Sequence, residues 1–93
     1  MLTIVIPKFY KVRKGQTLGM IAEAFSVPET RIVYDNSLKG EVSEGQILRL
    51  PAERHNLYVV RAGDTKTLLC GNAENYRKLN GTNAFYPGMK IWI

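Results

Sequence analysis

The clearest pattern along the chain is an arrangement of apolar and polar positions that occurs twice. Residues 10–13 alternate apolar and basic side chains (Tyr-Lys-Val-Arg), and residues 58–61 repeat the motif (Tyr-Val-Val-Arg). Residues 47–50 and 90–93 then close each half of the chain with a second alternating segment. Alternation of this kind predicts short, half-buried strands. Because the whole pattern recurs, we predict one small supersecondary unit used twice.

Two helical patterns lie between the strands of the first unit. Thr17 is suited to the N-cap of a helix, and apolar residues follow at helical spacing at Leu18, Ile21, Ala22 and Phe25. A second helix is predicted from Pro28 to about Asp35, and Asn36 is expected to end it and to tie the following loop by hydrogen bonds. The order strand, helix, helix, strand buries the inward strand residues only if the strands pair antiparallel with both helices on one face. The predicted fold is α+β.

The second unit has the same order but is shorter. Its first helix is expected to be little more than one turn, Asn72 is expected to cap the next helix, and Asn80 with Gly81 is expected to stop it. The predicted organisation is two tandem βααβ modules at residues 10–51 and 58–93, joined by a linker at 52–57 and preceded by a segment at 1–9. In that first segment the alternation of Leu2, Ile4 and Ile6 predicts a possible extra strand.

One apolar surface is not explained by the repeat. On the outward side of the second pair of strands lie Val59 and Trp92, where the first pair carries Lys11 and Arg49. A sheet face with these two apolar side chains should be covered. The candidates are the N-terminal segment, the other module or a second chain.

The repeated residues, taken in order, resemble the LysM (lysin motif) family. The resemblance covers residues 10–93. The first repeat supplies Tyr10, Val12, Gly15, Thr17, Leu18, Ile21, Ala22, Asn36, Gly45, Gln46, Leu48, Leu50 and Pro51. The second supplies Tyr58, Val60, Gly63, Asp64, Thr65, Asn80, Tyr86, Pro87, Gly88, Ile91 and Ile93.

This resemblance implies binding to glycans that contain N-acetylglucosamine, such as peptidoglycan or chitin. In the family the groove lies between the loop into the first helix and the loop after the second. By position, the candidate residues are Gly15, Gln16, Thr17, Leu18, Ser37, Leu38 and Lys39, and then Gly63, Asp64, Thr65, Lys66, Gly81, Thr82 and Asn83. Gln16 departs from the family's acidic residue and Lys66 from its leucine. Because the second unit has also lost part of its first helix, we expect the first module to bind more strongly.

An N-acetyl sugar presents an amide, hydroxyls and a methyl group. A groove for it needs exposed backbone groups and a small apolar notch. Gly15 and Gly63 suit close approach to the backbone, and Leu18 with Leu38 could line the notch. The alternative for the glycines is a tight turn without a ligand. Asp64, like Thr65, is expected first of all to cap a helix.

Composition narrows the remaining classes of function. The chain has 13 Lys and Arg against 8 Asp and Glu, giving a net charge of +5, and these residues are spread over both repeats. Such a balance can favour an acidic polymer, but without a basic cluster we expect no nucleic-acid partner. The single histidine, His55, lies in the linker, and the single cysteine, Cys70, is expected to be an inert core thiol. We therefore expect neither an enzyme nor a metal or cofactor site.

The first residues do not resemble a signal peptide, because they lack basic residues and Pro7 interrupts the apolar run. No stretch is long enough to insert into a membrane. Synthesis in the cytoplasm and action at a cell wall, spore coat or phage particle are expected. The alternative to glycan binding is a protein-assembly or targeting module, or a homodimer, that uses the Val59/Trp92 face or the N-terminal segment.

Overall fold

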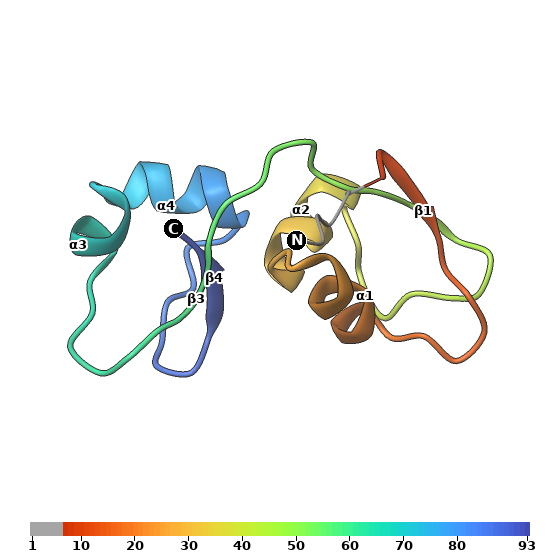
Figure 1. Cartoon of the computed structure of the whole chain (residues 1–93), viewed down its shortest axis with the longest axis horizontal. Coiled ribbons are helices and arrows are strands. Elements are labelled where there is room, and N and C mark those ends of the chain that lie inside the picture. The colour runs from red at the N-terminus through yellow and green to blue at the C-terminus, as the bar shows by residue number, and fades with distance from the viewer. Residues whose placement is uncertain (1–6) are drawn as a thin grey trace, which may run out of the picture.

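The computed structural model describes residues 7–93, so the predicted strand at Leu2–Ile6 lies outside the described residues. Two halves lie next to each other, each with two helices and two strands (Figure 1). The elements are β1 (Phe9–Lys11), α1 (Leu18–Phe25), α2 (Glu29–Asn36), β2 (Ile47–Arg49), β3 (Leu57–Val59), α3 (Lys66–Cys70), α4 (Ala73–Asn80) and β4 (Lys90–Trp92). β1 pairs with β2 and β3 with β4, both antiparallel. The predicted α+β class is confirmed.

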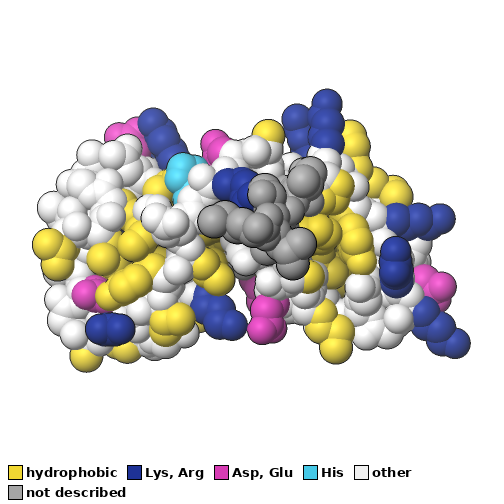
Figure 2. Space-filling view, in the orientation of Figure 1, with side chains coloured by type: hydrophobic (Ala, Val, Ile, Leu, Met, Phe, Trp, Pro, Cys, Tyr) yellow, Lys and Arg dark blue, Asp and Glu magenta, His cyan; other side chains and the backbone are white. Residues whose placement is uncertain are grey.

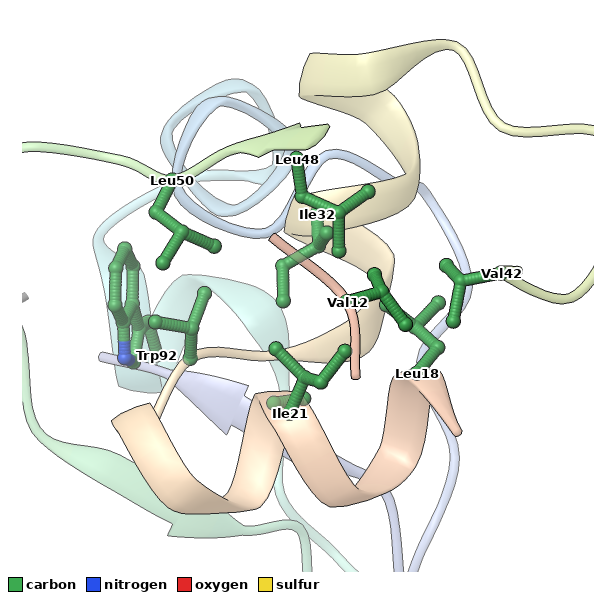
Figure 3. Packing of buried hydrophobic residues seen from close by; sticks show 10 residues of the cluster. Val12, Leu18, Ile21, Ile32, Val42, Leu48, Leu50 and Trp92 are labelled. Atoms are coloured by element: carbon green, nitrogen blue, oxygen red, sulfur yellow. The ribbon is translucent and has the colours of Figure 1, made fainter. Parts of the chain in front are cut away.

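Helix boundaries in the first module follow the predicted signals. The Oγ1 of Thr17 accepts a hydrogen bond from the amide of Met20 at 3.2 Å and so caps α1. Ser26 ends that helix in the left-handed conformation, and Pro28 stands directly before α2. The two helices and the strands enclose one apolar cluster (Figure 3), whose buried members include Val12, Leu18, Ile21, Ile32, Leu48 and Leu50.

The second module has a smaller core of its own. α3 has five residues and none of them is buried, as expected from the shortened sequence. The buried cluster consists of Val60, Tyr76, Met89 and Ile91. The Tyr76 hydroxyl donates to the carbonyl of Ala84 at 2.5 Å, and burial raises the pKa of this tyrosine to about 12. Units of about forty residues rarely hold together on so few side chains without further support.

That support comes from Trp92, which leaves its own module and enters the core of the first. Its side chain is 0% exposed and belongs to the first module's cluster, where it lies beside Leu50 (Figure 3). The indole Nε1 donates to the carbonyl of Ser26 at 2.9 Å. Of the three candidates for covering Trp92, the first module is the one observed. Val59, on the same outward side of the strands, remains 49% exposed.

Arg31 of α2 fixes the same junction through polar contacts. Its Nη1 donates to the carbonyl of Leu79 at 3.0 Å, and its Nη2 lies 2.5 Å from a carboxylate oxygen of Glu53 in the linker. The guanidinium lies 5.8 Å from the centre of the Trp92 ring, within the range of a cation–π contact. An ion pair with Asp35 holds the side chain in place. The two modules are therefore joined by a packed tryptophan and a cation with several partners.

Asn36 and Asn80 play matching roles at the ends of α2 and α4. We predicted that Asn36 ties the following loop, but Asn36 and Asn80 each tie a strand instead. The Asn36 side chain accepts from the amide of Arg49 at 2.7 Å and donates to its carbonyl at 2.8 Å. Asn80 makes the same pair with Trp92, at 2.7 and 3.0 Å. The asparagines thereby lock each closing strand onto the second helix of its module.

Replacing Trp92 with alanine is expected to lower the free energy of unfolding by about 3–5 kcal/mol, because it leaves a cavity at the junction. Trp92→Phe keeps much of the apolar volume but loses the hydrogen bond to Ser26, so a loss of about 1–2 kcal/mol is expected. Urea denaturation followed by circular dichroism measures both. A Trp92→Ala loss no larger than that of Val59→Ala would contradict this role.

Asn80→Ala is expected to lower the free energy of unfolding by more than Asn36→Ala does. Asn80 is 0% exposed, so its loss leaves the backbone groups of Trp92 buried without partners, at a cost of about 1–3 kcal/mol. The bonds of Asn36 to Arg49 are exposed, and water can replace them. The same denaturation series tests the difference, and equal losses would show that burial does not decide the cost.

Candidate functional site

The turns that lead into α1 and α3 are closed by side-chain acceptors at equivalent positions. In the first module the Oε1 of Gln16 accepts from the Tyr10 hydroxyl and from the amide of Arg13, both at 2.8 Å. The neutral amide thus supplies the same acceptor as Asp64 does at the equivalent position of the second module. The Nε2 of Gln16 forms no hydrogen bond within residues 7–93, so a donor remains on the surface of this turn.

In the second module the Oδ2 of Asp64 accepts from the Tyr58 hydroxyl at 2.7 Å and from the amide of Arg61 at 2.8 Å. These bonds lower the pKa of Asp64, and the bond from Tyr58 raises the pKa of that tyrosine. The prediction that Asp64 caps a helix is wrong, since Thr65 alone accepts from the first turn of α3, at the amide of Leu68.

Gly15 and Gly63 leave the backbone of these turns accessible. Both have positive φ, +79° and +93°, a conformation that favours glycine. A Cβ added at either position would meet no atom within 4 Å. The glycines therefore make the turn, and the space above them is open to a ligand.

The two predicted walls of the first groove are linked by a residue that we did not predict. The Oε1 of Glu41 accepts from the amide of Leu18 at 2.8 Å and from that of Val42 at 3.0 Å. These bonds, first of all the one from Leu18, lower the pKa of Glu41. The carboxylate thus connects the start of α1 to the loop after α2.

The apolar notch that we expected is reduced to one residue. The Leu18 side chain is 7% exposed and belongs to the core, so only its backbone faces the turn. Leu38 is half-buried against the same core and keeps part of its surface accessible. Thr17, Ser37 and Lys39, the other candidates, are exposed.

The second groove is bridged in a different way. The Nζ of Lys66 donates to the carbonyl of Asn83 at 2.7 Å, which joins the two predicted walls, and lies 5.1 Å from the ring centre of Tyr76. Thr82 is half-buried, and its hydroxyl accepts from the amide of Ala84. Gly81 belongs to the module junction, because a Cβ there would lie 2.6 Å from the Cβ of Tyr34. This groove is more occupied by its own side chains than the first.

Groups with possible reactivity lie apart from both grooves. Cys70 is half-buried in the second module, and burial raises the pKa of its thiol. The His55 ring packs 5.1 Å from the ring of Trp92. Within residues 7–93 no three acidic, cysteine or histidine residues gather to form a metal site. Likewise, none of the helices described is long and apolar enough to span a bilayer.

Comparison with known proteins finds a family match in the first module. The family model of the LysM domain matches residues 10–51. The solved structures similar to the chain include the spore cortex-lytic enzyme SleL of Bacillus megaterium QM B1551, at 26% identity, and that of Bacillus cereus, at 21%. In both cases the TM-score is 0.45, and the match covers 91% of this chain but only 22% of the enzyme. No curated protein matches the chain.

The hydrogen bond between Glu41 and Leu18 is expected to titrate at acid pH. Because the folded-state pKa of Glu41 is lowered, its contribution to stability is present above the unfolded-state pKa and is lost as the pH falls through the folded value. The amide proton shift of Leu18 should therefore follow the Glu41 carboxyl signal in an NMR titration. Glu41→Gln should abolish that transition. A Leu18 shift that titrates unchanged in the variant would contradict the assignment.

Proposed function

We propose that this protein is a non-catalytic carbohydrate-binding protein for glycans that contain N-acetylglucosamine, such as peptidoglycan or chitin. The observation that carries the proposal is the match of residues 10–51 to the LysM domain, a family that the sequence itself resembles and that binds such glycans. The groove of the first module is the main binding site. Its residues are Gly15, Gln16, Thr17, Leu18, Ser37, Leu38 and Lys39.

The chemistry of the first groove fits a neutral acetamido sugar. The open backbone at Gly15 and the side-chain amide of Gln16 offer polar groups, and Leu38 offers a small apolar surface for the acetyl methyl group. Glu41 holds the two walls together through one carboxylate oxygen. Its other oxygen can accept a hydrogen bond from a sugar hydroxyl or amide.

The second groove is proposed as a weaker site, with Gly63, Asp64, Thr65, Lys66, Gly81, Thr82 and Asn83 in the corresponding positions. A sugar there would have to displace the Lys66 ammonium from the carbonyl of Asn83. Each site should be weak, with a dissociation constant of about 10⁻⁵ to 10⁻³ M, because sugar hydroxyls exchange water for protein at little net gain. The protein would then act at a cell wall, spore coat or phage particle.

The alternative is a protein-assembly module. The sequence supported this alternative through an apolar face formed by Val59 and Trp92. In the structure the first module of the same chain covers Trp92, so this residue is not available to a partner. Leu57 and Val59 remain 40% and 49% exposed. A protein partner would therefore bind to this smaller surface.

Isothermal titration with chitin oligomers and muropeptides tests the proposal. Leu38→Ala is expected to weaken binding about fivefold to tenfold, because it removes apolar contact with the acetyl group. Leu68→Ala is the matched control, since Leu68 is 75% exposed on α3 and lies outside both grooves. Circular dichroism of each variant verifies folding.

Two results would count against glycan binding in the first groove. One is equal affinity of the Leu38 and Leu68 variants. The other is no heat of binding with any oligomer while the wild-type protein forms a stable dimer, which would favour the assembly alternative.

A further inference from the structure

A groove lies between the two modules and is separate from both loop sites. The sequence did not predict it. It has a volume of about 360 Å³, and residues of both modules line it. From the first module come Gly19, Glu23, Glu29 and Thr30, and from the second come Leu57, Tyr86, Met89 and Lys90. Small-molecule sites commonly have volumes of about 300–1,000 Å³. The groove exists because Trp92 and Arg31 hold the modules against each other.

We propose that this groove is a further subsite for a neutral N-acetylated hexosamine of the same glycan. The inference rests on the proposed function and extends it to a surface that the tandem arrangement creates. Its walls offer the two kinds of group that a sugar ring needs, an exposed aromatic face and polar groups that are not already paired.

The aromatic group is Tyr86, which is 56% exposed although its neighbour in the groove, Met89, is buried in the core. An exposed ring next to apolar side chains can pack against the C–H face of a sugar, and it loses little conformational entropy in doing so. Leu57, at 40% exposed, extends this apolar wall.

The polar groups come from both modules, Glu23 and Glu29 from the first and Lys90 from the second. Glu23, Glu29 and Lys90 line the groove, and none of them forms a salt bridge within residues 7–93. Acidic and basic side chains both gather at the lower edge of the boundary between the two halves (Figure 2). The carboxylates can accept hydrogen bonds from sugar hydroxyls and the ammonium can donate one. With two carboxylates against one ammonium, the groove disfavours an anionic ligand.

The start of α2 supplies donors for an acetamide carbonyl. Pro28 precedes the helix and makes no side-chain cap, and the amides of Glu29 and Thr30 form no hydrogen bond within the described chain. The Oγ1 of Thr30 is also buried without a partner. This oxygen has almost no accessible surface, so the donors for the acetamide carbonyl at this turn are the amides of Glu29 and Thr30.

The loop site and the intermodule groove share the first turn of α1. Leu18 belongs to the loop site, and the next residue, Gly19, lines the intermodule groove. A Cβ at Gly19 would lie 2.6 Å from the Oε1 of Glu29, so the glycine lets this carboxylate lie close against α1. In the proposal, a glycan chain bound at the loop passes the start of α1 and enters the groove between the modules.

Titration of the ¹⁵N-labelled full chain with chitobiose and chitohexaose tests the proposal. Chitohexaose is expected to shift the amides of Glu29, Thr30 and Tyr86 in addition to those of the first loop groove. Tyr86→Ala should weaken chitohexaose binding roughly tenfold and leave chitobiose binding within about twofold, because a stacked ring is a dominant contact. Glu29→Gln should also weaken the longer oligomer selectively.

Tyr34→Ala is the matched control, because Tyr34 is 63% exposed and does not line the groove. Shifts confined to the first loop groove, with equal affinities for the Tyr86 and Tyr34 variants, would overturn the intermodule subsite and leave the proposed function intact. Shifts at the groove without shifts at the loops would support the subsite and overturn the loop site. No shifts anywhere would overturn both.

Discussion

The burial of Trp92 in the first module is the interaction on which the rest of the structure depends. The cluster of the second module has only four buried residues, too few for a unit of its size to be stable alone. Sending its largest side chain into a neighbouring core supplies the missing apolar contact and completes that core at the same time. Arg31 restricts the relative orientation of the modules, because its partners lie in α2, the linker, α4 and β4. The pair fixes how the modules face each other.

Under the proposed function, a fixed arrangement changes how two weak sites could act together. Flexibly linked sites gain from effective concentration only if the linker lets both reach the same polymer. Here the docking places α1 and α2 of one module opposite β3, β4 and the preceding turn of the other, and a groove results. In the proposal the glycan therefore binds to a surface that both modules form. The second module contributes to that surface even though Lys66 partly occupies its own loop groove.

The sequence predicted the modules well because their signals are local. Thr17 and Pro28 specify helix starts through caps and fixed dihedrals, and the alternation at Leu48 and Leu50 specifies which strand face is buried. Trp92 has the outward parity of its own strand, so sequence could indicate that it needs covering but not by what. The asparagines were recognised as helix ends, but their bonds to Arg49 and Trp92 join residues that only the folded strands bring close.

The site was harder to predict because its decisive contacts span the fold. Glu41 reaches the amide of Leu18 across 23 positions of sequence, and nothing in the sequence distinguishes it from Glu44 in the same loop. Gln16 departs from the family pattern, yet the structure explains it, since an amide oxygen closes the turn as a carboxylate does. The intermodule groove could not be predicted at all, because it depends on the relative placement of the modules.

Trp92 is the only tryptophan in the chain, so its fluorescence reports the module junction directly. The most direct test of the account follows this fluorescence and the amide signals of β1 and β2 through one urea titration of the wild-type protein. If Trp92 completes a shared core, its emission shifts to that of exposed indole in the same transition in which the first module's amide signals disappear. Exposure of Trp92 at a lower urea concentration, with the first module still folded, would contradict the account.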